Sequence, residues 1–376
     1  MEKELKDKEV KDKEVVNKAL IKVGITLGDL NGVGPEIIVK ALQDNRILND
    51  ITPVVYGSNK VISYYKKQLN LNEFNYLSCK SAAEISSKKV NIINVWQEEV
   101  ALAPGSSNAD GGKYALLSLE AATKDLADGK IDVLVTAPFS KENVTKAGFT
   151  FPGHTEYLAE MSGTKDALMV LVSGNLRVAL VTTHIPVKDI ATQLQKELIV
   201  AKIEAFEQSL KKDFGLIRPR IAVFGLNPHA GENGKIGEEE QQVIIPAIQA
   251  AKQKGVLAFG PYPADGFFGS PLRQQFDGVL AMYHDQGLAA FKALCFDDGV
   301  NFTAGLPIVR TSPDHGTAFD IAGKLSADEQ SLRSAIFLAV DIYRKRKLFK
   351  EINANPLAVS KGEKTEKGKK EQDRED

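Results

Sequence analysis

Short apolar runs alternate with helical stretches along most of this chain, and that alternation limits the fold more than any other feature. Runs typical of buried strands lie at 21–27, 52–56, 90–95 and 131–136, and helical stretches such as 113–126 separate them. Parallel strands need long crossover connections, usually helices, so the pattern predicts a largely parallel sheet covered on both faces. The expected class is α/β, and 376 residues are enough for two domains.

A second group of apolar runs follows the first. Its members lie at 167–172, 177–183, 220–225, 255–260 and 278–283. Only Ser173-Gly174-Asn175 and Leu176 separate the first two, which favours an antiparallel hairpin and therefore a mixed sheet. A charged amphipathic stretch at 328–347 is expected to form a closing helix.

Composition and charge exclude several classes of function. The formal net charge of −1 gives no reason to expect a nucleic-acid partner, and no run of about 18 apolar residues is present to span a membrane. Cys79 and Cys295 are too few for a disulfide framework, and the N-terminus has no apolar signal-peptide core. We therefore expect a cytoplasmic protein with charged, solvated extensions at 1–20 and 351–376.

Three of the five histidines follow apolar runs in the same way. His184, His229 and His284 each stand in the loop just after a predicted strand. If these strands are parallel neighbours, the three imidazoles gather along one sheet edge and suit Zn²⁺, Co²⁺ or a related divalent metal. The alternative is that each histidine bonds only to loop backbone. Asp265 either supports this metal site or stabilises a turn.

Further polar residues near strand ends indicate an anion site. Lys292 and Arg310, with Asn301 between them, could bind a phosphate or a carboxylate. His154 and Thr155 stand where a helix is expected to start, so backbone N–H groups add donors there. The competing interpretations are solvated Lys and Arg side chains and a simple N-cap by Thr155.

The first predicted strand leads into Gly28-Asp-Leu-Asn-Gly32-Val-Gly34-Pro35. This is a tight strand-to-helix turn, whose helix start either faces an anion or binds no ligand. The spacing is not G-x-G-x-x-G, so the Rossmann dinucleotide fingerprint is absent here.

Six loops, in order along the chain, carry motifs that match one known family. They are Gly28-Asp29…Gly34-Pro35-Glu36, Gly153-His154-Thr155-Glu156, Thr183-His184-Ile185-Pro186, Asn227-Pro228-His229-Ala230-Gly231-Glu232, Tyr283-His284-Asp285-Gln286-Gly287 and Asp314-His315-Gly316-Thr317-Ala318. Together they resemble the 4-hydroxythreonine-4-phosphate dehydrogenase family of pyridoxal phosphate biosynthesis. Two departures are visible: Leu30 stands where the family commonly has proline, and Gly266 where a larger polar residue is usual.

The resemblance implies a fold like that of isocitrate and isopropylmalate dehydrogenases, with two α/β/α domains and a central cleft. The first domain would comprise 21–150 with 305–350, and the second 151–304. The family is a homodimer with its active site at the subunit interface. Each site would hold NAD(P) and one divalent metal (Zn, Mg or Co), bound by His184, His229 and His284, with His284 reaching the site of the partner subunit.

The resemblance also implies residue roles. The substrate-binding positions are His154, Thr155, Lys292, Asn301 and Arg310. Lys292 or Asp265 would take the hydroxyl proton. The segment containing His315, Gly316, Thr317, Ala318 and Asp320 is similar to a loop that isopropylmalate dehydrogenases use against the NAD adenosine, and is expected to bind the cofactor.

The implied reaction is the metal-dependent, NAD-linked oxidation of 4-phosphooxy-L-threonine to 2-amino-3-oxo-4-phosphooxybutanoate, which decarboxylates to 3-amino-2-oxopropyl phosphate. One alternative is a paralogue of the same fold acting on threonate or erythronate 4-phosphate or on a dihydrodiol carboxylate. Another is a metal-dependent hydrolase that binds no nicotinamide. A pure binding or scaffold role gives no reason to gather titratable groups at strand exits.

Overall fold

The computed structural model describes residues 20–164 and 167–355, and within them a mixed twelve-stranded sheet forms the centre of the molecule. The strand order is β3-β4-β2-β1-β5-β12-β11-β6-β7-β10-β8-β9. The strands are β1 (Ile21–Thr26), β2 (Ile51–Gly57), β3 (Tyr76–Cys79), β4 (Val90–Asn94), β5 (Val133–Thr136), β6 (Leu168–Ser173), β7 (Leu176–Leu180), β8 (Arg220–Phe224), β9 (Leu257–Tyr262), β10 (Gly278–Ala281), β11 (Val300–Ala304) and β12 (Arg310–Pro313).

The α-helices of the described residues lie between these strands and after the last of them. They are α2 (Gly34–Leu42), α3 (Asn59–Gln68), α4 (Ala109–Ala127), α5 (Lys141–Lys146), α6 (His154–Met161), α7 (Ile190–Gln193), α8 (Lys196–Lys212), α9 (Ile245–Gln253), α10 (Ala264–Gly269), α11 (His284–Leu294) and α12 (Gln330–Ile352).

The sheet contains two parallel sets of strands that run in opposite directions. The first set is β3, β4, β2, β1, β5 and β12, and the second is β7, β10, β8 and β9. Strands β11 and β6 join the sets through three successive antiparallel pairings, which reverse the strand direction. The predicted mixed sheet and the hairpin across Ser173-Gly174-Asn175 are therefore confirmed.

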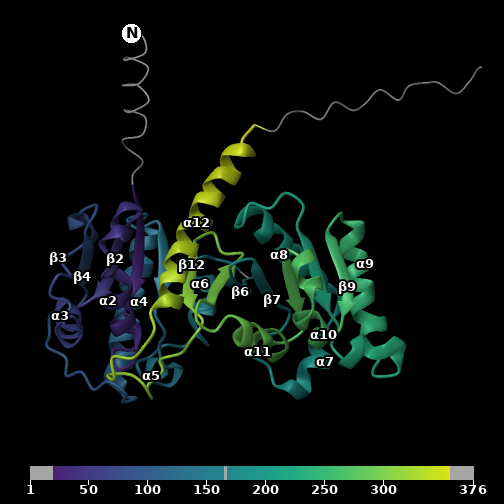
Figure 1. The fold of residues 1–376 in the computed structure, drawn as a ribbon, viewed down its shortest axis with the longest axis horizontal. Helices are drawn as coiled ribbons and strands as arrows, with labels where there is room; N and C mark the ends of the chain where they lie inside the picture. The colour runs from purple at the N-terminus through teal and green to yellow at the C-terminus, as the bar shows by residue number, and fades with distance from the viewer. Residues whose placement is uncertain (1–19, 165–166, 356–376) are drawn as a thin grey trace, which may run out of the picture.

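Helices cover both faces of the sheet, and the side-chain alternation of the strands explains why (Figure 1). Val54 and Tyr56 of β2 pack with Ala122 and Leu126 of α4, whereas Val55 belongs to the core on the opposite face. Helix α12 crosses the middle of that opposite face in Figure 1 and packs on β12 and β5. The α/β class predicted from the sequence is confirmed.

Each of the nine predicted runs contains a strand, but β3, β11 and β12 were not predicted. The apolar run that ends at Arg310 leads into β12, which begins at that residue. Helix α12 continues to Ile352, two residues into the segment expected to be a tail. Residues 1–19 and 356–376 of the expected extensions lie outside the described residues. Because one sheet runs through both halves, the division into two domains stays a prediction.

Within 20–164 and 167–355, no helix has the length and apolar composition needed to cross a bilayer.

Candidate active site

A cavity of about 370 Å³ brings most of the predicted site residues together. It draws on β5, β11 and β12 and on the helices α6 and α11. All five predicted substrate residues and two of the three predicted metal ligands line it, namely His154, Thr155, Lys292, Asn301, Arg310, His184 and His284. The structure therefore brings seven of the predicted site residues together, and their roles stay predictions.

Strand alternation places the polar side chains on the floor of the cavity. In β11, Val300 and Phe302 pack into the core that includes α12, so Asn301 and Thr303 point to the other face. In β12, the Thr311 hydroxyl donates to the Ala335 carbonyl of α12 at 2.8 Å, so its neighbour Arg310 also points to the cavity side. One period-two pattern thus directs side chains of both strands into the site.

Arg310 is a buried cation without a carboxylate partner in the described part of the chain. Only 3% of it is exposed, and its Nε and Nη2 donate to Thr136 Oγ1 at 3.1 and 2.6 Å. Its Nη1 donates to Thr303 Oγ1 at 3.2 Å. Burial lowers the pKa of Arg310 to about 10, while the negative charge of Glu156 acts in the opposite direction. Such an unneutralised guanidinium favours a bound anion.

Helix α6 begins inside the cavity. His154 is its first residue and stacks on Phe139 with ring centroids 3.8 Å apart. Burial lowers the pKa of His154 well below its ordinary value, and the charges of Arg310 and Lys141 add to this effect, so the imidazole is neutral. The N-cap is the glycine before His154, and the Thr155 hydroxyl lies 3.5 Å from that of Thr303. The N-cap interpretation of Thr155 is therefore wrong.

Helix α11 presents His284, Leu288 and Lys292 to the cavity because residues four apart share one helix face. Lys292 Nζ donates to the Asp314 carbonyl at 2.8 Å and lies 3.5 Å from Asp314 Oδ1. Burial raises the pKa of Asp314, an effect that Lys292 opposes. Two more polar atoms, Asn301 Oδ1 and His315 Nε2, are buried without a hydrogen-bond partner. The cavity therefore has unpaired polar groups for a ligand.

Two imidazoles meet at one end of this cavity. The rings of His184 and His284 lie 5.9 Å apart between centroids, and Glu156 Oε1 is 4.0 Å from His184 Nδ1. Burial lowers the pKa of His184, which favours the neutral form that binds metals. The resemblance implied that His284 serves the site of the partner subunit, whereas here it lies beside His184 of the same chain.

His229 does not line the cavity, although its strand is placed as expected. Strands β7, β10 and β8 are parallel neighbours, as the three-histidine hypothesis required. However, the chain after β8 enters a left-handed turn at His229, whose φ is 53°, and the residue is exposed. Asp265, on α10, is also exposed and lies outside the cavity lining. Among the described residues, no group of three His, Cys, Asp or Glu is arranged to hold a metal.

The expected cofactor segment begins in the cavity and then covers the first loop. His315 and Gly316 line the cavity, and the Thr317 carbonyl accepts the Val33 N–H at 3.0 Å. Ala318 has a φ of 45°, and Asp320 is exposed.

The loop after β1 is buried under this segment. A Cβ added to Gly32 would lie 2.9 Å from the Thr317 carbonyl oxygen, which explains the glycine. Pro35 and Glu36 at the start of α2 are buried as well. The structure therefore supports a tight turn rather than a helix start open to an anion. Of the two departures, Leu30 is buried and Gly266 is exposed with no atom within 4 Å of an added Cβ.

Several residues of the cavity were not predicted. They are Thr136, Phe139, Lys141, Glu156, Ser312 and Asp314, together with Thr303 behind Arg310. Thr303 stands two positions after Asn301 in the alternating stretch Val-Asn-Phe-Thr-Ala, and that pattern could have identified it. Thr136 is the last residue of a predicted strand.

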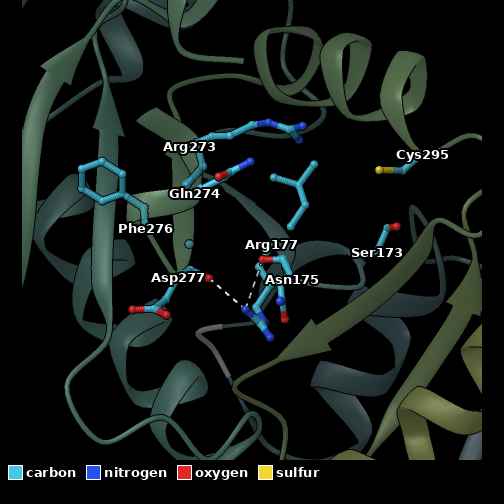
Figure 2. Close-up of a pocket in the computed structure, with 11 residues that line it drawn as sticks. Ser173, Asn175, Arg177, Arg273, Gln274, Phe276, Asp277 and Cys295 are labelled. Atoms are coloured by element: carbon cyan, nitrogen blue, oxygen red, sulfur yellow. Dashed lines mark hydrogen bonds between the residues drawn. The ribbon is translucent and has the colours of Figure 1, made fainter. Parts of the chain in front are cut away.

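A second cavity, of about 340 Å³, lies at the opposite, amino ends of β7 and β10 (Figure 2). Arg177 donates there to the carbonyl groups of Asn175 and Asp277, both at 3.2 Å, as the dashed lines in Figure 2 show. None of the predicted site residues lines it. The first cavity is therefore the candidate active site.

The fold and site define an α/β protein whose main polar cavity holds a buried guanidinium without a carboxylate partner and two neighbouring imidazoles. Comparison with known proteins identifies the family. A family model described as "Pyridoxal phosphate biosynthetic protein PdxA" matches residues 49–339. The chain belongs to this family, as its loop motifs predicted.

Three relatives illustrate the match. A 4-hydroxythreonine-4-phosphate dehydrogenase of Bacteroides thetaiotaomicron is 50% identical over 338 residues, which are 90% of this chain and 93% of that protein. The solved Klebsiella pneumoniae enzyme of the same name is 38% identical with a TM-score of 0.72, covering 86% of this chain and 99% of that one. A D-threonate 4-phosphate dehydrogenase of Cupriavidus necator is 41% identical over 326 residues, covering 86% of this chain and 98% of that protein. These relatives are oxidoreductases by name.

Proposed function

We propose that this protein oxidises 4-phosphooxy-L-threonine at C3 to 2-amino-3-oxo-4-phosphooxybutanoate, which decarboxylates to 3-amino-2-oxopropyl phosphate, in pyridoxal 5'-phosphate biosynthesis. The observation that carries this proposal is the unneutralised guanidinium of Arg310 in a cavity that Lys292 and the His184–His284 pair also line. The names of the relatives supply the substrate. The protein would act in the cytoplasm and would need neither a membrane nor nucleic acid.

The residues of the cavity divide into three groups by chemistry. Arg310, His154, Thr155 and Asn301 provide donors and an acceptor that fix the phosphorylated substrate. Lys292 would take the C3 hydroxyl proton, and we favour it over Asp265 because Lys292 lines this cavity and Asp265 does not. His315 and the segment to Asp320 would hold NAD(P).

The neighbouring imidazoles of His184 and His284 fit a divalent cation such as Zn²⁺, Co²⁺ or Mg²⁺, and burial favours the neutral form of His184. When bound, the cation would lower the pKa of the substrate alcohol and offset the charge left by decarboxylation, and the nicotinamide would supply the hydride acceptor. His229 is exposed in its own chain, so we propose that it completes the site of a second copy in a homodimer.

A subunit-mixing experiment tests the shared site. His184→Ala and His229→Ala proteins are each expected to be inactive, because each lacks one ligand. In a mixed dimer one site has His184 and His284 from one chain and His229 from the other, so it is intact. Random pairing should therefore restore about a quarter of wild-type activity, through half of the dimers and one site in each. A mixture that stays inactive after refolding together would contradict the shared site.

An NADH-coupled assay tests the substrate. The specificity constant for 4-phosphooxy-L-threonine should exceed those for D-threonate 4-phosphate, erythronate 4-phosphate and a dihydrodiol carboxylate. D-threonate 4-phosphate is the second candidate, since a relative named for it is 41% identical. NAD should also raise the melting temperature, by roughly the equivalent of 2.7 kcal/mol at a hundredfold excess over Kd. A protein that NAD does not stabilise would favour the hydrolase alternative.

A further inference from the structure

The loop after β8 has an unusual backbone conformation. All six residues from His229 to Gly234 have positive φ, with values of 53, 50, 77, 42, 58 and 91°. Four of the six carry a Cβ, and the left-handed conformation costs such residues roughly 1–2 kcal/mol each. A run of this kind persists only where its surroundings hold it in place.

Glu240 is the group that holds the beginning of this loop. The residue is 2% exposed, and its Oε1 accepts the N–H groups of Leu226 and Asn227, both at 2.7 Å. Its Oε2 accepts Asn227 Nδ2 at 3.0 Å. No cation of the described chain forms an ion pair with Glu240, so its charge is balanced by N–H donors alone.

The middle of the loop also packs against this carboxylate. A Cβ added to Gly231 would lie 2.4 Å from Glu240 Oε2, so the left-handed run passes directly over the acid. Glu240 is the first residue of a π-helical turn, Glu240–Ile244, a local distortion that is frequent at functional sites. The loop at Gly231 and the helical turn that carries Glu240 therefore both depart from regular backbone geometry.

We infer that Glu240 is a positioning residue, whose carboxylate fixes the left-handed turn that presents His229 to the His184 and His284 pair of a second copy. The inference rests on the proposed function, because it needs His229 as a ligand of a shared metal. Without the carboxylate, the backbone N–H groups of Leu226 and Asn227 lose their acceptor, and Asn227 Nδ2 keeps only its bond to Glu239. The turn can then relax to ordinary negative φ. His229 would then no longer meet the pair in a fixed position.

The test measures Co²⁺ binding to full-length Glu240→Gln and Glu240→Ala proteins, by titration and by the visible absorption of the bound ion. Loss of supporting contacts around metal ligands typically weakens metal affinity about 10- to 100-fold. We expect Kd to rise by this factor in Glu240→Ala and by less in Glu240→Gln, which keeps one oxygen for the two backbone N–H groups. The cobalt bands should change in intensity, because the coordination geometry changes.

Glu36→Gln provides the matched control. Glu36 is also a fully buried carboxylate, and its Oε1 accepts the Ala327 N–H at 3.0 Å and Lys40 Nζ at 2.8 Å, remote from His229. Its substitution should lower the melting temperature but leave the cobalt Kd and spectrum unchanged. If Glu240→Ala does not fold, Glu240→Gln is compared with Glu36→Gln at matched stability.

The outcomes separate this inference from the proposed function. A His229→Ala protein that binds Co²⁺ like the wild type overturns the shared metal site, and with it the role of Glu240. If His229→Ala binds Co²⁺ poorly while both Glu240 variants keep a wild-type Kd and spectrum, only the role of Glu240 is overturned. The inference also fails if Glu36→Gln weakens Co²⁺ binding as much as Glu240→Gln does.

Discussion

Replacing Arg310 by methionine should weaken substrate binding without weakening the fold. Burial lowers its pKa from the ordinary arginine value to about 10, and each pKa unit is worth about 1.4 kcal/mol, so the folded state bears a cost of roughly 3 kcal/mol for this buried charge. The three hydrogen bonds to Thr136 and Thr303 return about 0.5–1.5 kcal/mol each. The two contributions nearly cancel, and the free energy of unfolding should change by less than about 1 kcal/mol.

The effect on catalysis should be much larger. A hydrogen bond to a charged group contributes about 1.5–3 kcal/mol, so losing the one between Arg310 and the substrate phosphate should raise KM roughly 10- to 150-fold. An NADH-coupled assay gives KM for 4-phosphooxy-L-threonine and for NAD separately. The reasoning is refuted if KM for the phosphorylated substrate is unchanged, or if KM for NAD rises instead.

Arg346→Met is the matched stability control. Arg346 is also largely buried, but its Nε lies 2.6 Å from Asp213 Oδ1, and its Nη1 donates to two main-chain carbonyls. Its removal leaves the buried Asp213 carboxylate without a counter-charge, which typically costs about 3–5 kcal/mol. Urea unfolding should therefore show a large decrease in the free energy of unfolding for Arg346→Met and almost none for Arg310→Met. Equal losses would mean that Arg310 is a structural arginine.

Three further predictions concern other parts of the molecule. Lys292→Met should lower kcat roughly 100-fold or more without changing metal content, and a normal kcat would exclude Lys292 as the base. Gly112→Ala should destabilise by about 1–3 kcal/mol in urea unfolding, because its Cβ would lie 2.2 Å from main-chain atoms of Asn143. Gly269→Ala, with no atom within 4 Å of its Cβ, should change stability by less than about 1 kcal/mol; similar losses in both would contradict this reasoning. Burial raises the pKa of Asp29 above 3.8, so the stability of the wild type relative to Asp29→Asn should be greatest below that pH and fall as pH rises through the raised pKa. Urea unfolding at several pH values checks this, and a difference independent of pH would contradict it.

The sequence predicted the elements with strong apolar runs and missed those with weak ones. Strand β12 contains Arg310-Thr-Ser-Pro, which has no apolar residue, and β11 alternates polar and apolar residues within five positions. Both are strands because the neighbouring strands and α12 supply their partners, and that information is not local in the chain.

The candidate active site was also predicted only as far as local sequence allowed. The loop contexts of His184 and His284 predicted their meeting, because exits from neighbouring parallel strands lie close together. The context of His229 looked identical, yet its loop turns away through six consecutive residues with positive φ. Asn and His adopt positive φ more often than most residues, but only as single positions, so their preference does not predict such a run. Glu240 controls that turn from eleven positions away, so the deviation depends on a tertiary contact.

The position of β12 has a consequence for synthesis on the ribosome. This strand lies between β5 and β11 in the sheet. The edge of β5 therefore has no strand partner until residues 310–313 have emerged from the ribosome. Chains released before Arg310 would present an open strand edge, the kind of surface that invites aggregation. The residues from Arg310 onward thus complete the sheet and, at the same late stage, add the cation that we propose binds the substrate phosphate.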